Sequence, residues 1–232
     1  MSLRKWDELP EFMKNDQVRP YYDALKRKRR TLIFKRLFDI AASLVLLLIF
    51  LPVFVVIATA IKLDSKGPVF YRQVRITRYG EKFRIFKFRS MVDDADKKGS
   101  AVTVGNDPRV TRVGRFIRKF RLDEMCQLID VLRGTMTFVG TRPEVPEYVE
   151  RYTDEMMATL LLPAGVTSEA SIFYKNESRL LDSTEDADRT YVEHILPDKM
   201  GYNLRALKDF SFWRDLRIMI LTVIAVFVKK DG

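Results

Sequence analysis

The longest run of hydrophobic positions in the 232-residue chain lies between Leu37 and Leu63. Within that run Asp39 and Lys62 are the only charged residues. A helix needs about 20 apolar residues to cross the hydrocarbon core of a bilayer, so this run is long enough for a span. The pattern predicts a membrane helix over residues 33–64.

The charges that flank this helix bear on its topology. Basic residues precede it at Lys26–Arg30 and follow it between Lys66 and Arg78. Because Lys and Arg accumulate on the cytoplasmic side of a membrane, both ends are expected on that side. Pro52, after Leu51, removes a backbone hydrogen bond near the middle and bends the helix. This favours a re-entrant helix, and a single crossing with a tolerated proline remains the alternative.

Three further features belong to the expected membrane arrangement. Asp39 is expected at headgroup level, paired with Arg36 or a neighbouring lysine. Residues 1–32 are basic, with apolar positions at helical spacing, which is typical of an interfacial amphipathic arm or of a frayed leader. The apolar run at 218–228 is too short to span, so it should dock on the core or lie at the interface.

Residues 65–232 are expected to form one cytosolic domain with interfacial helices. Two β-rich runs, Gly67–Ile76 and Glu81–Ser90, flank a turn signal at Tyr79-Gly80 and predict a hairpin. Strand alternation puts Lys87 and Arg89 on a common side, either in a site or on a solvated edge. Helical periods dominate the remainder, so the expected fold class is mainly α with a small β-hairpin (α+β), in a monotopic membrane protein.

Two helices follow the hairpin in sequence. The first is basic and amphipathic, and its face could bind lipid headgroups, an RNA backbone or a nucleotide diphosphate. Its apolar positions recur at i, i+3, i+4 and i+7, at Val113, Phe116, Ile117 and Phe120. The second helix is expected to begin at Asp123 or Glu124 and to end at Gly134.

Composition limits the chemistry. The chain has 41 Lys+Arg against 31 Asp+Glu, a net charge of +10 that favours anionic partners. A single cysteine, Cys126, excludes an internal disulfide, and a single histidine, His194, leaves no His/Cys cluster for zinc. Both residues are assigned to structure, so any metal must be held by oxygen ligands.

The adjacent carboxylates of Asp123 and Glu124 have two explanations. Acidic residues in a first helical turn commonly cap free N–H groups and complement the helix dipole. The same helix start attracts phosphate, and Arg118 and Arg142 are candidates to hold one there. Two carboxylates facing a diphosphate require a divalent cation, and oxygen ligands with a diphosphate select Mg²⁺. An aspartate that attacks phosphorus would form an acyl phosphate.

With these motifs the chain resembles the small monotopic phosphoglycosyl transferases, bacterial sugar transferases that start glycan assembly on polyprenyl phosphate. The likeness is close over about residues 33–150 and looser at Phe212–Ile218. The matching motifs are Lys35–Asp39, Gly67–Phe70, Phe86–Met91, Asn106–Arg115, Leu122–Glu124, Gln127-Leu128 and Val139–Glu144.

The resemblance implies a two-step reaction and assigns residues to it. Asp123 would attack the β-phosphate of a UDP-sugar, releasing UMP, and polyprenyl (undecaprenyl) phosphate would then take the phosphosugar. Glu124, with Asp123, would hold Mg²⁺. Phosphate binding would fall to Arg142, with Lys87, Arg89 and Arg118 as further candidates in the site, and the membrane kink to Leu51-Pro52.

The resemblance also implies a setting. The enzyme would work at the cytoplasmic face of the bacterial inner membrane, with the phospholipid bilayer as a partner and no nucleic acid; a homodimer is allowed. Three departures from the family pattern leave the sugar undetermined: Gly140-Thr-Arg-Pro143 for Gly-Pro-Arg-Pro, Pro163–Ser171 without its usual tryptophan and glutamine, and Asn203 at an acidic position.

Two rival functions come from other classes. A non-catalytic membrane adaptor would bind anionic lipid through the basic surface and tolerate Asp123→Asn. A membrane-tethered nucleic-acid binder would show a salt-dependent affinity for oligonucleotides that ignores UDP-sugar and Mg²⁺.

Overall fold

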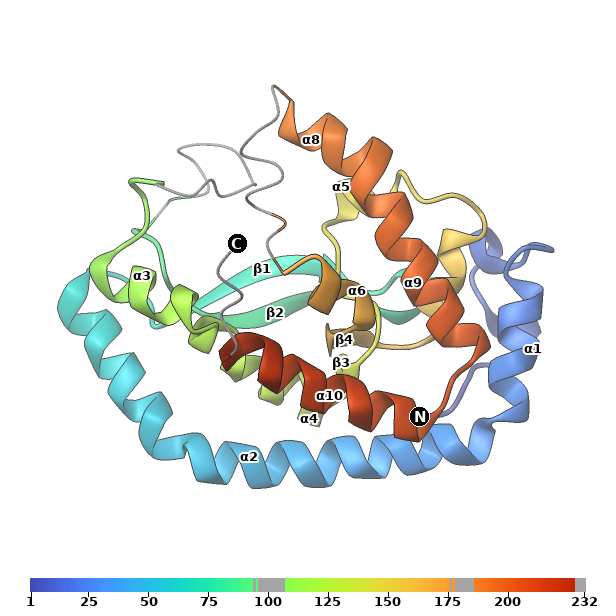
Figure 1. The fold of residues 1–232 in the computed structure, drawn as a ribbon, viewed down its shortest axis with the longest axis horizontal. Helices are drawn as coiled ribbons and strands as arrows, with labels where there is room; N and C mark the ends of the chain where they lie inside the picture. Colours follow the sequence, from blue (N-terminus) through green and yellow to red (C-terminus); the bar gives the residue numbers. More distant parts are fainter. Residues whose placement is uncertain (94, 96–106, 176, 178–185, 228–232) are drawn as a thin grey trace.

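The computed structural model describes residues 1–93, 95, 107–175, 177 and 186–227. The last residue of the C-terminal apolar run at 218–228 lies outside these ranges. Figure 1 shows helices arranged around two small sheets, with one long helix, α2, along an edge of the molecule. The expectation of a mainly helical α+β fold is confirmed.

Apart from α2, the described helices and strands are each 16 residues long or shorter. In the first part of the chain they are 3₁₀ turns Trp6–Glu8 and Glu11–Met13, α1 (Arg19–Arg27), α2 (Arg29–Asp64), β1 (Phe70–Ile76), the 3₁₀ turn Arg78–Gly80, β2 (Lys82–Phe88), α3 (Arg112–Lys119) and the 3₁₀ helix η5 (Leu122–Gln127). In the second part they are α4 (Leu128–Arg133), β3 (Met136–Val139), α5 (Pro146–Val149), η6 (Met156–Leu161), β4 (Ala164–Thr167), α6 (Glu169–Phe173), α8 (Ala187–Thr190), the π-helical turn η7 (Tyr191–Ile195), α9 (Leu196–Lys208) and α10 (Phe212–Phe227).

The predicted hairpin is present. Strands β1 and β2 pair antiparallel, with Val74 opposite Arg84. The turn contains Tyr79 at φ 58° and Gly80 at φ 76°, left-handed conformations that let the chain reverse tightly. Phe83 and Ile85 are buried on one face of β2, as the alternation predicted. Phe88, at the opposite alternation position, is also buried and packs with Ile57 and Ile61 of the long apolar helix, so β2 contributes buried side chains from both faces.

A second sheet was not predicted. Strands β3 and β4 pair in parallel, with Met136 opposite Ala164. Gly165, which pairs with Thr137, lets the backbone of Gly140 approach closely, because a Cβ on Gly165 would lie 2.2 Å from the carbonyl oxygen of Gly140. Each strand has only four residues, too few for alternation to be recognised. This sheet fixes where the chain enters the Gly140–Pro143 segment.

The N-terminal segment packs into the main hydrophobic cluster. Leu9, Met13, Val18 and Leu25 are almost fully buried there, against side chains of η6 and α9. An interfacial arm and a frayed leader were therefore both wrong. The apolar spacing in residues 1–32 reflects contacts with the rest of the domain, made through two 3₁₀ turns and α1.

Helix α2 is continuous over 36 residues and is apolar enough, by length and composition, to cross a membrane. Figure 1 shows it running beneath the domain and bending toward α3. Leu32 packs in the main cluster, whereas Ile57 and Ile61 pack with residues of β2 and α3. Leu51 and Pro52 are exposed on the opposite face. Both ends of α2 therefore contact the same domain.

Polar contacts also attach α2 to the core, and they correct the prediction for Asp39. Its side chain is buried, accepts a hydrogen bond from Thr137 Oγ1 at 2.7 Å and lies 3.5 Å from the Phe138 amide of β3. Its hydrogen-bond partner is Thr137 of β3, where Arg36 or a lysine was expected. Lys35 forms a buried ion pair with Asp215 of α10, at 2.5 Å. In the C-terminal apolar run, Ile218 is buried against the core, whereas Ile220, Leu221, Val223 and Ile224 are exposed, so the described part docks on the core at its start.

Candidate active site

The chain reverses sharply between α3 and η5. Arg121 stands at the turn with φ 54°, a left-handed conformation uncommon for a residue with a side chain. The reversal places Asp123 and Glu124 in the first turn of η5, which packs against β2 and α3. Buried Cys126 fixes the base of this turn in the core. The predicted helix end at Gly134 is confirmed, with φ 88° at that glycine.

Glu124 is surrounded by cations. Its Oε1 accepts a hydrogen bond from Lys87 Nζ at 3.3 Å, and its Oε2 accepts one from Arg142 Nη1 at 3.2 Å. Arg142 Nη2 also donates to Oε1, and Arg121 Nη1 lies 3.9 Å from Oε2. Burial would raise the pKa of Glu124, but the Arg142 and Lys87 charges outweigh it and hold that pKa well below its usual range. Glu124 is therefore ionised at neutral pH.

Asp123 has the opposite environment. Among the described residues its carboxylate has no side-chain hydrogen bond or ion pair. Burial, followed by the negative charge of Glu124, raises the pKa of Asp123 from 3.8 to about 6, against the opposing charges of Lys87 and Arg118. Two neighbouring carboxylates whose pKa values are pushed apart are typical of an active site in which each has its own role.

The cations that face the dyad come from separate elements. Lys87 projects from β2, and its pKa is lowered by burial even though Glu124 opposes that effect. Arg142 follows β3, and Glu124 raises its pKa. Arg118 is half-buried on α3, and its charge lowers the pKa of Asp123. Three of the predicted phosphate-binding residues thus converge on the dyad.

Arg89 is placed differently. Its Nη1 donates to the Lys66 carbonyl at 2.7 Å, and its Nη2 donates to the Ser65 carbonyl at 2.8 Å. A Cβ on Gly67 would lie 1.9 Å from Arg89 Nη1, so this turn is built around the guanidinium. Strand β2 ends at Phe88, one residue before Arg89. These hydrogen bonds of Arg89 fix the turn after α2. Neither Lys87 nor Arg89 lies on a solvated strand edge.

Sequence reasoning missed several side chains next to Arg142. Glu144 is buried two residues further on, where Tyr191 Oη donates to its Oε1 at 2.6 Å. Lys199 and Arg75 complete this group, at 3.6 and 4.0 Å from Glu144 oxygens. The position of Glu144 in the Val139–Glu144 motif was the one available signal, because its partners are remote in the chain.

The fit of the dyad to Mg²⁺ depends on what its oxygens already contact. Within the described ranges, no group of three or more His, Cys, Asp or Glu side chains is arranged to hold a metal. Glu124 is engaged by Lys87 and Arg142, which leaves Asp123 as the less committed carboxylate. Such a donor set fits a Mg²⁺ ion that takes most of its ligands from a diphosphate and water.

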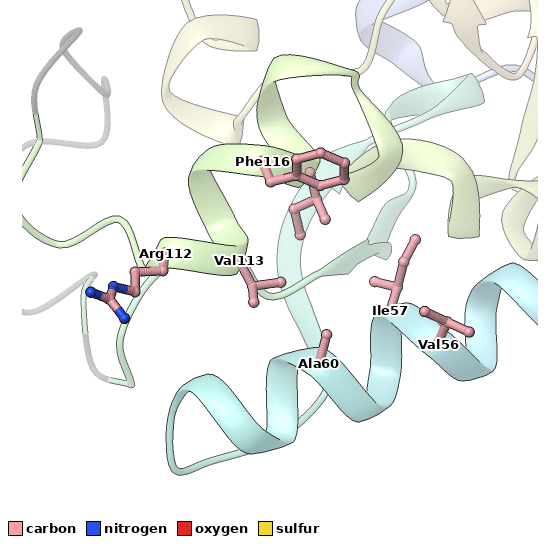
Figure 2. A pocket seen from close by; sticks show the side chains of 7 residues that line it. Val56, Ile57, Ala60, Arg112, Val113 and Phe116 are labelled. Atoms are coloured by element: carbon pink, nitrogen blue, oxygen red, sulfur yellow. The ribbon is translucent and has the colours of Figure 1, made fainter.

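An apolar cavity of about 340 Å³ lies between α2 and α3. Figure 2 shows Val56, Ile57 and Ala60 of α2 facing Val113 and Phe116 of α3, with the Arg112 guanidinium turned away from them. The dyad does not line this cavity. It belongs to the contact between the apolar helix and the basic helix.

Comparison with known proteins places the chain in a family. The model for the family described as bacterial sugar transferase matches residues 30–229. A UDP-glucose:undecaprenyl-phosphate glucose-1-phosphate transferase of Klebsiella pneumoniae is 38% identical over 206 residues, 87% of this chain and 42% of that protein. The Escherichia coli K12 protein of the same description is 36% identical over 225 residues, 95% of this chain and 46% of its own length.

The chain thus spans less than half the length of these two relatives. A shorter relative, the uncharacterized sugar transferase EpsL of Bacillus subtilis, is 33% identical over 199 residues, 86% of this chain and 90% of that protein. The motifs recognised in the sequence lie almost entirely within the matched residues, and the Asp123-Glu124 dyad is among them. The chain belongs to the bacterial sugar transferase family.

Proposed function

We propose that this protein transfers a sugar-1-phosphate from a UDP-sugar to undecaprenyl phosphate, through a covalent intermediate on Asp123. The observation that carries the proposal is that the two adjacent carboxylates, Asp123 and Glu124, have different environments. Glu124 is held ionised by Arg142 and Lys87, whereas the Asp123 carboxylate has no side-chain partner among the described residues and has a pKa of about 6. The names of the relatives, which describe transfer of sugar-1-phosphate to undecaprenyl phosphate, support the same reaction.

The first step forms an acyl phosphate. A carboxylate oxygen of Asp123 attacks the phosphorus that carries the sugar, and the bond from this phosphorus to the bridging oxygen of the diphosphate breaks. UMP leaves with that oxygen and the bonding electron pair. At neutral pH most of the Asp123 population is ionised, so the nucleophile needs no separate base.

The second step regenerates the enzyme. A phosphate oxygen of undecaprenyl phosphate attacks the same phosphorus, the Asp123 oxygen leaves, and the phosphosugar is joined to the lipid through a new diphosphate. Arg142 and Lys87 lie beside the reacting carboxylate and can bind the phosphoryl oxygens as their contacts with Glu124 loosen. Mg²⁺, when bound, would neutralise charge on the diphosphate.

The membrane arrangement in this proposal is a re-entrant α2 at the cytoplasmic face of the inner membrane. Contacts at both of its ends support this arrangement, because Leu32 and Ile61 pack on the same domain, whereas a crossing helix would separate them by the membrane. Exposed apolar side chains cover the other face of α2, a surface that suits hydrocarbon. Pro52 supplies the bend.

Release of UMP tests the reaction. Protein in detergent, with Mg²⁺ and undecaprenyl phosphate, is incubated with a panel of UDP-sugars. We expect metal-dependent UMP from at least one sugar, abolished by Asp123→Asn and retained by Asp154→Asn, an exposed aspartate that serves as the matched control. A protein that binds anionic liposomes but forms no UMP with any sugar would instead be the membrane adaptor.

Cysteine labelling tests the topology. Single cysteines replace Arg27 and Lys66, exposed residues that flank α2, in a Cys126→Ser background. We expect an impermeant reagent to label both positions from the same side of inverted membrane vesicles. Labelling from opposite sides would exclude the re-entrant arrangement and leave the catalytic proposal standing.

A further inference from the structure

A buried charged cluster lies behind the candidate active site. Tyr191 Oη donates to Glu144 Oε1 at 2.6 Å, and Lys199 Nζ donates to Tyr191 Oη at 2.9 Å. Lys199 Nζ is also 3.6 Å from Glu144 Oε1 and 2.9 Å from Glu177 Oε2. Glu144 and Lys199 are each 6% exposed and Tyr191 is 4% exposed. The reaction proposed above uses none of these residues.

The cluster is joined to the backbone on which Arg142 sits. Glu144 is two residues beyond Arg142, and Arg75 of β1 donates to the intervening Pro143 carbonyl at 3.3 Å. Tyr191 begins the π-helical turn that leads into α9, the helix that carries Lys199. Single π-helical turns are rare and occur frequently at functional sites. The cluster therefore ties the Arg142–Glu144 segment to α9.

The charges near Arg142 indicate how the buried cluster acts on the Arg142 side chain. Arg142 contacts Glu124, and the charges of Glu144 and Glu177 act on it as well. Either of these carboxylates, left without its own cation, would compete with Glu124 for the guanidinium. Lys199 reaches both, and Arg75 lies 4.0 Å from Glu144 as well, so Lys199 is a cation that the two competitors share.

We propose that Lys199 is a positioning residue, which keeps Arg142 on Glu124 and available to phosphate by holding Glu144 and Glu177 away from it. The geometric part of this inference stands without the transferase reaction, whereas its kinetic consequence rests on the proposed function. The competing explanation is a cluster that only stabilises the fold. The two differ in whether the effect of losing Lys199 depends on Arg142.

A double-mutant cycle separates them. The kcat/KM for UMP release is measured for Lys199→Met in the wild-type background and in Arg142→Lys. We expect about a tenfold loss in the wild-type background and less than about a twofold loss in Arg142→Lys, because the arginine that Lys199 positions is already gone. Equal losses in both backgrounds would overturn the proposal. Lys199→Arg should restore most of the activity.

The matched control lies on the same helix. Lys208→Met makes the identical substitution at an exposed position near the end of α9, and it should leave kcat/KM within about twofold of wild type. Melting curves establish that each variant is folded at the assay temperature. If Lys199→Met does not fold, the same cycle is run with Tyr191→Phe, which removes the hydrogen bond to Glu144 and predicts the same dependence on Arg142.

A spectroscopic measurement decides the geometric part independently of turnover. The Arg142 guanidinium signal of ¹⁵N-arginine-labelled protein is assigned by its disappearance in Arg142→Lys. We expect this signal to shift in Lys199→Met and to return toward its wild-type position when Glu177→Gln is added, because one competing carboxylate is then neutral. An unchanged signal in Lys199→Met would overturn the proposal. A shifted signal in a protein that releases no UMP would retain the positioning role and reject the proposed function.

Discussion

Replacing Glu124 by Gln should move the acid limb of the pH–rate profile to lower pH. In wild type the pKa of Asp123 is about 6, raised by burial and by the Glu124 charge. Asp123 is then mostly ionised at pH 7 and mostly protonated at pH 5, so the first step should slow by roughly an order of magnitude between them. Glutamine removes the repelling charge and frees Lys87 and Arg142 to act on Asp123, and both changes lower its pKa.

The same substitution should reduce the rate at pH 7. Lys87 and Arg142 lose the carboxylate that orients them, and we expect a fall on the order of a hundredfold in the first step. The fold should lose about 1–3 kcal/mol of stability, since two partly buried cations lose the carboxylate to which they are hydrogen bonded. Melting curves for Glu124→Gln therefore accompany the kinetics, to set an assay temperature at which the protein is folded.

The assay is single-turnover release of UMP with enzyme in excess and no acceptor lipid, from pH 5 to 8 at constant ionic strength. Omitting the lipid removes a phosphate that titrates near pH 6, and constant salt keeps the screening of charges fixed. Glu150→Gln, at an exposed glutamate, is the control and should keep the wild-type profile. An acid limb that stays in place or moves to higher pH in Glu124→Gln would refute the reasoning.

Three further outcomes are expected. Arg118→Met should move the acid limb of UMP release to higher pH, because the Arg118 charge lowers the pKa of Asp123. Asp123→Asn should be more stable than wild type at pH 8, with a free energy of unfolding about 1–3 kcal/mol larger in denaturant titrations. A carboxylate whose pKa is raised on folding loses stability as pH rises from about 4 to 6, so this difference should vanish below pH 4. Gly165→Ala should destabilise the fold by about 1–3 kcal/mol because its Cβ would collide with Gly140. Gly201→Ala on helix α9 should stabilise the fold by about 0.5–1 kcal/mol in the same denaturation assay, because its Cβ would meet no atom within 4 Å.

Local pattern was sufficient for several elements. The α2 helix, the hairpin with its turn at Tyr79-Gly80, and the end of α4 at Gly134 all follow from apolar runs, alternation and residues that adopt left-handed conformations. The dyad was also recognised as a candidate from its neighbours in sequence. These features depend on residues close together in the chain, whose preferences survive in the folded protein.

Predictions about what covers a residue were less successful. Asp39 was expected to pair with Arg36 or a lysine, and its hydrogen-bond partner is Thr137 of β3. Arg89 was expected in the site, and the turn after α2 takes its guanidinium. In both places the residue type was informative about charge, but the partner comes from a distant segment that periodicity does not reveal.

The sequence by itself determined the chemistry available to this protein: a long apolar helix, a basic surface and an adjacent pair of carboxylates. Only the tertiary structure decided that the two carboxylates have different environments, because Lys87 and Arg142 reach Glu124 from β2 and from the segment after β3. It also decided that Lys199 contacts Glu144, two residues beyond Arg142. Ion pairs of this kind form between segments brought together by core packing, so their geometry follows from the fold as a whole and not from any local run of residues.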